Sequence, residues 1–180
     1  MRLSLLTICL FLAACGQKPL PVIGDVPRFQ LTDQLGRNFD SSALDGHVWV
    51  ADFIFTNCEG PCPRMSSHMK ALQGKTDSGV KLISFTVDPA RDTPPVLAEY
   101  AKKFEDDSKK WLLLTGSVAT LNMLDEDAFK LGTVGGEIEH STYFALVDKK
   151  GHIRGMYGLS TGDPVERIAK DAARLEKESS

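Results

Sequence analysis

The chain has 180 residues and a mildly acidic composition, with 21 Lys and Arg against 24 Asp and Glu and a formal net charge of −3 at pH 7. It contains no basic block, which argues against nucleic acid as a partner. The sequence has no internal repeat or low-complexity tract, and its length beyond the N-terminal segment suits one domain with a substantial core.

The N-terminal segment has the features of a bacterial lipoprotein signal. One positive charge, Arg2, precedes a short apolar stretch and small residues, and this stretch is well short of the roughly 20 residues of a membrane-spanning helix. Residues 12–15 read Leu-Ala-Ala-Cys, which is typical of a lipobox whose cysteine is lipidated after cleavage. We therefore predict that Cys15 is a lipid anchor and that Cys9 is discarded. An ordinary signal cut elsewhere, with Cys15 incidental, is the alternative.

These features predict a signal peptide at residues 1–14, a Pro- and Gly-containing tether at 15–24, and a domain at 25–180. Cleavage would remove Arg2 as the one charged residue of the signal, so the net charge of −3 would become −4. The predicted location is extracytoplasmic, anchored by lipid to a bacterial membrane on its periplasmic side or at the cell surface.

The rest of the chain alternates between strands and helices, after a short hairpin at residues 29–39 with its turn near Asp33 to Gly36. The first predicted strand is almost continuously apolar, which indicates burial on both faces. Strands are predicted at residues 48–55, 81–87, 111–114, 142–147 and 152–157, and helices at 63–72, 94–104, 118–131 and 163–176. This order predicts an α/β fold of thioredoxin type, with a central sheet flanked by helices and an N-terminal hairpin.

Cys58 and Cys62 lie at the junction of the first buried strand and its helix, and they are the only thiols left after the predicted cleavage. In an exported protein such a pair is oxidised unless a reductant or a metal protects it. A first-turn position for Cys62 would favour its thiolate. A purely structural disulfide is a weaker interpretation, because closing so short a loop restricts the unfolded chain only slightly. The pair therefore indicates metal binding or thiol–disulfide chemistry.

Spacing separates these two chemistries. General dithiol oxidoreductases place two residues between their cysteines and a proline before a late strand, whereas this chain has three intervening residues and His140 in the comparable stretch. Two thiolates and an imidazole form a soft site suited to Cu(I) and, with a fourth weak ligand, to Cu(II). A solvated loop histidine is the alternative interpretation of His140.

Three other histidines compete with His140. We expect His68 on the outer face of the helix that follows Cys62, and His47 and His152 at the surface. The glycine-containing stretch at residues 132–136 either lets His140 swing onto and off a metal or is simply a loop.

Four further side chains deserve an assignment. Met65 and Met69 could offer thioether sulfur to copper, but their spacing of four residues is typical of a buried stripe and we expect them in the core. Glu59 and Asp52 could tune the charge of the site or serve only as solvated groups.

With these motifs in place, the chain resembles the Sco/SenC family of membrane-anchored, copper-binding, thioredoxin-like proteins. The matching segments follow the family order over residues 25–175. They are residues 52–58, Cys62-Pro63, residues 84–94 with Leu97 and Tyr100, residues 111–116, and His140-Ser141 ahead of residues 146–148. The Val-Asp-Pro-x-Arg-Asp-Thr-Pro stretch beside the cysteine pair is the most specific of them, although by itself it is only a capped helix start.

The resemblance implies copper binding by Cys58, Cys62 and His140 and a role in maturing the dinuclear copper site of cytochrome c oxidase. Some family members look more like thiol reductants of the oxidase subunit. The family often has Pro-Asp-Val or Pro-Asp-Ile between the cysteines, where this chain has Glu59-Gly60-Pro61, so loop stiffness, redox potential and partner recognition can differ.

The sequence thus predicts a copper metallochaperone whose partner is the copper-bearing subunit of cytochrome c oxidase or another copper or thiol protein. The rival is an enzyme, an extracytoplasmic thiol–disulfide oxidoreductase that keeps client cysteines reduced. A peroxidase of the thioredoxin superfamily would need its nucleophilic cysteine in a Thr- and Pro-rich loop near an arginine. A pure scaffold would leave the paired thiols unexplained.

Overall fold

The computed structural model describes residues 18–104, 109–131 and 142–178. Cys15 and His140 lie outside the described residues, so the predicted lipid anchor and the predicted imidazole ligand stay predictions. Among the described residues, no helix combines the length and the apolar content needed to span a bilayer.

The described strands form one mixed sheet in the order β1-β8-β7-β4-β5-β6-β2-β3. Strands β4, β5 and β6 are parallel, and the remaining neighbours pair antiparallel. The strands are β1 Gly24–Asp25, β2 Gln30–Asp33, β3 Asn38–Asp40, β4 Trp49–Ile54, β5 Lys81–Thr86, β6 Trp111–Thr115, β7 Tyr143–Val147 and β8 His152–Gly158.

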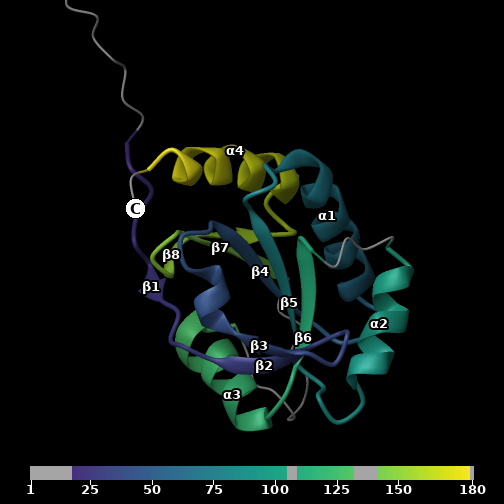
Figure 1. Ribbon diagram of the computed structural model, residues 1–180. Helices are drawn as coiled ribbons and strands as arrows, with labels where there is room; N and C mark the ends of the chain where they lie inside the picture. The colour runs from purple at the N-terminus through teal and green to yellow at the C-terminus, as the bar shows by residue number, and fades with distance from the viewer. Residues whose placement is uncertain (1–17, 105–108, 132–141, 179–180) are drawn as a thin grey trace, which may run out of the picture.

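Helices cover both faces of this sheet, with α1, α2 and α4 on one side and α3 on the other (Figure 1). The helices are α1 Cys62–Lys75, α2 Pro94–Lys102, α3 Val118–Asn122 and α4 Pro164–Glu176, with a 3₁₀ turn η1 at Ser41–Leu44 and a π-helical segment η2 at Met123–Phe129. The predicted α/β class is confirmed, and so are the layers of helix on both sides of a central sheet.

Strand β4 is the centre of the molecule. All six of its residues are buried, as predicted. Val50 and Ile54 pack with α1, α2 and α4 on one face, while Trp49, Ala51 and Phe53 pack with α3 and η2 on the other. Because side chains alternate along a strand, β4 contributes to both apolar clusters at once.

The predicted N-terminal hairpin is confirmed as β2 and β3, which pair antiparallel from Gln30 opposite Asp40. Its turn is fixed by the Asp33 carboxylate, which accepts hydrogen bonds from the backbone N–H groups of Leu35 and Arg37, each at 2.9 Å. Gly36 takes the positive φ of 75° that this turn requires.

The helix predicted over residues 118–131 is present over residues 118–129, but only its first part is an α-helix. The short α3 continues into the wider, π-helical segment η2. This segment ends at its C-cap Lys130, which has a φ of 57°. Leu124 and Phe129, five residues apart, are both buried against the sheet. The wider π turn brings residues at this spacing onto one face, which a regular α-helix does not.

The first described residues, 18–25, lie against the domain, although the sequence predicts most of them as part of the tether. Strand β1 pairs with β8, with Gly24 opposite Ile153 and Asp25 opposite His152. Composition gave no sign of this strand.

Candidate metal centre

The cysteine loop runs from the end of β4 to the start of α1, at the edge of the sheet where the parallel strands β4 and β5 both end. Cys62 is the first residue of α1, as predicted, and Pro63 follows it at a position where no backbone donor is needed. The backbone N–H of Cys58 donates to the Phe55 carbonyl at 3.3 Å, and that of Met65 donates to the Pro61 carbonyl at 3.0 Å. Both cysteines are therefore held by short-range backbone bonds on each side of the loop.

Cys58 and Cys62 form no disulfide in the described part of the chain, and both are almost completely removed from water. The exposed fraction is 7% for Cys58 and 2% for Cys62, and both belong to the apolar cluster beneath α1. A hydrogen bond joins the two side chains. The loop thus offers a pair of soft sulfur donors that already face each other in a dry environment.

The protonation of Cys62 differs from the sequence expectation. Burial raises the pKa of its thiol, the hydrogen bond with Cys58 raises it further, and a hydrogen bond with the Phe55 backbone acts in the opposite direction. Burial therefore acts against the predicted stabilisation of a Cys62 thiolate at the helix N-terminus. A cation that binds here has to displace the thiol proton.

Asp52 lies on β4 between Val50 and Ile54, on the face that packs against α1. Its Oδ1 accepts a hydrogen bond of 2.5 Å from the Ser84 hydroxyl, while its Oδ2 is buried with no hydrogen-bond partner among the described residues. Burial raises the pKa of this carboxyl to about 7, against the opposing effect of the Ser84 hydrogen bond. Its charge also contributes to the raised pKa of Cys62, so Asp52 acts on the site electrostatically.

Asp92 braces the cysteine loop, a role that sequence reasoning missed. It is 1% exposed and accepts hydrogen bonds from the Thr56 backbone N–H at 3.1 Å, from the Thr56 hydroxyl at 2.6 Å and from the Thr86 hydroxyl at 2.6 Å. Thr56 is two residues before Cys58. The specific stretch at residues 87–94 is thus more than a helix start, since its buried carboxylate ties the ends of β4 and β5 together.

The described histidines lie away from the cysteine pair or pack elsewhere. His47 forms a 3.0 Å hydrogen bond between Nδ1 and the Gly79 carbonyl, and His152 Nδ1 lies 3.2 Å from Asp148 Oδ2, both at the amino end of the central strands. His68 is half-buried, with its ring edge-on to Phe144 at 6.1 Å between centroids.

The structure also places the two methionines and the glutamate that the sequence offered as candidates for the site. Met65 and Met69 are completely buried in the apolar core, as predicted, and Glu59 is exposed. Within residues 18–104, 109–131 and 142–178, no group of three or more His, Cys, Asp or Glu side chains could hold a metal ion. Two of the three predicted ligands are together, and the third lies outside these ranges.

The comparisons with known proteins indicate one protein family. The family model described as SCO1/SenC matches residues 24–176. A SCO1/SenC family lipoprotein from Bacillus anthracis is 37% identical in structure-based alignment, which covers 87% of this chain and 98% of that one with a TM-score of 0.77.

Two further solved structures add chemistry. BsSco, a member of the Sco family of cytochrome c oxidase assembly proteins in which a disulfide switch was identified, is 31% identical over 90% of this chain and 100% of that one, with a TM-score of 0.80. ScoI from Bradyrhizobium japonicum, solved with copper bound, is 28% identical over 85% of this chain and 99% of that one, with a TM-score of 0.67.

The Asp92 brace generates a first prediction. Asp92→Ala removes the acceptor of three donors, the buried hydroxyl of Thr86 and the hydroxyl and N–H of the half-buried Thr56, and we expect a loss of about 3 kcal/mol in the free energy of unfolding. Because the loop then loosens, Cys58 should react faster with a water-soluble disulfide reagent. Asp77→Ala, which removes an exposed carboxylate far from the loop, is the control. Unchanged thiol reactivity in a destabilised Asp92→Ala protein would show that Asp92 supports the fold but not the loop.

Asp52 generates a prediction on pH. Its pKa is about 7 in the fold against an ordinary 3.8, so its contribution to stability is complete below about pH 4 and is lost as pH rises through 7. The difference corresponds to a loss of up to about 4 kcal/mol. Urea unfolding of the reduced protein between pH 4 and 7 measures it, and Asp52→Asn should lack this decline. Parallel curves for the two proteins would contradict the assignment.

Proposed function

The chain belongs to the SCO1/SenC family, and on that premise we propose that it is a copper-binding protein that serves the assembly of the copper site of cytochrome c oxidase. The observation that carries the proposal is the pair of dehydrated, hydrogen-bonded thiols at the strand-to-helix junction. In such a site an unpaired thiolate has a high desolvation cost, whereas the charge of a bound cation offsets the negative charge of the thiolates. The copper-bound relative supports the same chemistry.

We propose Cys58, Cys62 and His140 as the ligands. Strand β7 runs antiparallel to β4, with Ala145 opposite Ala51, so β7 begins at the end of the sheet where β4 finishes. This register supports His140 as the third ligand, because the chain enters β7 from the side of the cysteine loop. Thiolate and imidazole donors in this number suit Cu(I) and, with a fourth weak ligand, Cu(II).

Transfer would proceed by ligand exchange. A client thiolate or imidazole displaces His140 first, because imidazole is the weaker ligand for Cu(I). Cys58 and Cys62 then exchange their sulfur–copper bonds for protons, which balances the two protons given up on binding. The copper-bearing subunit of the oxidase, or another copper or thiol protein, would be the client.

We also propose that Cys15 carries the lipid and that residues 1–14 are removed, which would place the domain outside the cytoplasm on a bacterial membrane. The lipobox and the lipoprotein relative from Bacillus anthracis support this assignment.

A thiol–disulfide oxidoreductase is the second candidate, favoured by the contact between the two thiols and by the disulfide switch of BsSco. In that case Cys58 and Cys62 become a disulfide while a client disulfide becomes two thiols. This function predicts a potential of about −270 mV, near that of reducing thioredoxins, and independence from His140. The burial of both thiols disfavours it, because a client disulfide has to reach the attacking sulfur.

Anaerobic Cu(I) titration of the reduced protein against a competing chelator tests the proposal. We expect one tightly bound ion in the wild type and at least a tenfold weaker affinity, about 1.4 kcal/mol, in His140→Ala. Thiol oxidation should be unaffected by this change. His68→Ala, a histidine that packs on Phe144, is the matched control and should bind as the wild type does.

Equal affinity in wild type and His140→Ala would remove His140 from the site. Weak binding in all three proteins, together with a potential near that of thioredoxin, would replace the copper proposal with the oxidoreductase.

A further inference from the structure

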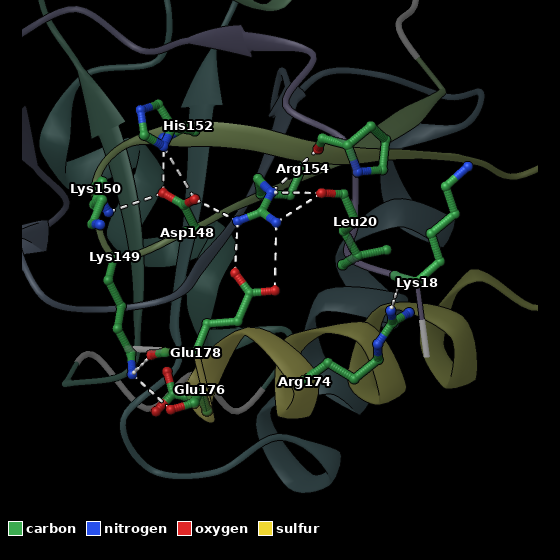
Figure 2. A network of polar contacts seen from close by, with 11 residues as sticks. Lys18, Leu20, Asp148, Lys149, Lys150, His152, Arg154, Arg174, Glu176 and Glu178 are labelled. Carbon is green, nitrogen blue, oxygen red and sulfur yellow. Dashed lines mark hydrogen bonds and ion pairs between the residues drawn. The ribbon is translucent and has the colours of Figure 1, made fainter. Parts of the chain in front are cut away.

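The chain ahead of β1 is fastened to the domain by two arginines. Arg154 donates from Nη2 to the Leu20 carbonyl at 2.7 Å and from Nε to the Pro21 carbonyl at 3.2 Å, and Arg174 Nη2 donates to the Lys18 carbonyl at 2.6 Å (Figure 2). The Arg154 side chain is only 9% exposed. Hydrogen bonds to three backbone carbonyls therefore hold the segment from Lys18 onward.

The same arginine also joins two other parts of the chain. Arg154 Nη1 donates to Asp148 Oδ2 at 2.8 Å and to Glu178 Oε2 at 2.9 Å, and Lys149 Nζ donates to the carbonyls of Glu176 and Glu178 (Figure 2). We refer to Arg154, Asp148, Glu178 and the carbonyls of Leu20 and Pro21 as the Arg154 clasp. A charge this buried persists only because each of its donors is paired.

Backbone and apolar contacts continue the attachment. The N–H of Ile23 donates to the Ile153 carbonyl at 2.8 Å, that of Val26 donates to the Gly151 carbonyl at 2.9 Å, and Leu20 packs against the apolar cluster beneath α4. The described part of the predicted tether is therefore a fixed strap.

This strap lies at the end of the sheet opposite the cysteines. Asp148 directly follows Val147, which pairs with Trp49, the first residue of β4, whereas Cys58 comes four residues after the last one. Six residues of strand separate the two ends by about 17 Å.

Exposed apolar side chains and cations occur on the strap and the elements it contacts, together with the anions Asp25 and the partly exposed Glu178. Val22 and Ile23 are 59% and 56% exposed, and three lysines are exposed on the elements that the strap contacts: Lys18 on the strap itself, Lys150 in the β7–β8 turn and Lys177 at the end of α4. We refer to these five residues as the anchor face. Asp25, the exposed anion of the strap, lies next to His152. Two apolar side chains with three cations fit the interface of an anionic bilayer.

We propose that the anchor face rests on an anionic lipid bilayer and that the Arg154 clasp orients the domain, so that the cysteine pair faces away from the membrane. This inference rests on the proposed lipid at Cys15 and not on copper binding. Cys15 is three residues before Lys18, so the lipid lies within about 11 Å of the strap. A lipid so close to a fixed strap leaves the domain little freedom to turn over.

The test uses the full lipoprotein, produced in a bacterial host, reconstituted in nanodiscs of phosphatidylcholine and phosphatidylglycerol. In a Cys58→Ser, Cys62→Ser background a nitroxide is placed at Pro27→Cys, near the strap, or at Glu59→Cys, in the cysteine loop; both positions are exposed. A nickel-chelating lipid in the disc reports proximity to the bilayer. We expect strong relaxation enhancement at position 27 and none at position 59.

Two changes locate the cause. Arg154→Ala should abolish the difference between the two positions, whereas Arg64→Ala, which removes an exposed arginine from α1, should preserve it. The pair Val22→Ser and Ile23→Ser changes exposed side chains without disturbing the clasp, and should reduce the enhancement at position 27. The result then does not depend on how well Arg154→Ala folds.

Equal enhancement at the two positions, or stronger enhancement at position 59, would overturn the proposal. A mature chain whose mass shows no lipid on Cys15 would overturn it as well. Cu(I) affinity, measured on a sample that keeps both cysteines, reports the proposed function separately.

Discussion

Every residue of strand β4 is buried, and the strand is hydrogen-bonded on one side to β5 in parallel and on the other to β7 in antiparallel orientation. A strand packed this way cannot shift its register without moving apolar side chains out of both cores. The carboxyl end of β4 therefore holds the cysteine loop in a fixed position. Its amino end lies beside the end of β7, next to Asp148 of the Arg154 clasp. The rest of the molecule is organised about these two ends.

Water exclusion at the carboxyl end decides what the cysteines can do. Cys58 and Cys62 are buried, and the partly unpaired carboxyl of Asp52 lies in the same apolar layer. An isolated negative charge is expensive there, so burial keeps the proton on the Cys62 thiol and makes that sulfur a poor nucleophile. A soft cation changes the balance, because it replaces the protons and offsets one thiolate charge as Cu(I) or both as Cu(II). Burial thus favours metal binding over disulfide exchange, while the Asp92 brace keeps the loop from opening to water.

The features that short stretches of sequence determine could be predicted from the sequence. The apolar run gave β4, Asp33 and Gly36 gave the hairpin turn, and the strand-to-helix junction placed Cys62 at the start of α1. What failed depends on contacts distant in sequence. The π-helical segment arises because Leu124 and Phe129 must both face the sheet. The brace needs β4 beside β5, and the strap depends on an arginine 134 positions from Leu20. The roles of His140 and Cys15 stay predictions.

The burial of the cysteine loop shows what the unusual residues between the cysteines, Glu59-Gly60-Pro61, can change. Glu59 and Gly60 are exposed, whereas the two cysteines that flank them are not. A Cβ added at Gly60 would meet the Cys58 sulfur at 3.8 Å, an ordinary contact, so neither sterics nor backbone conformation demands glycine there. The substituted residues therefore alter the exposed surface beside the two cysteines and leave the pair of sulfur donors in place. In the proposed orientation this surface faces away from the membrane, and the distance of the cysteine pair from the bilayer is then set by the length of β4 rather than by the length of a tether.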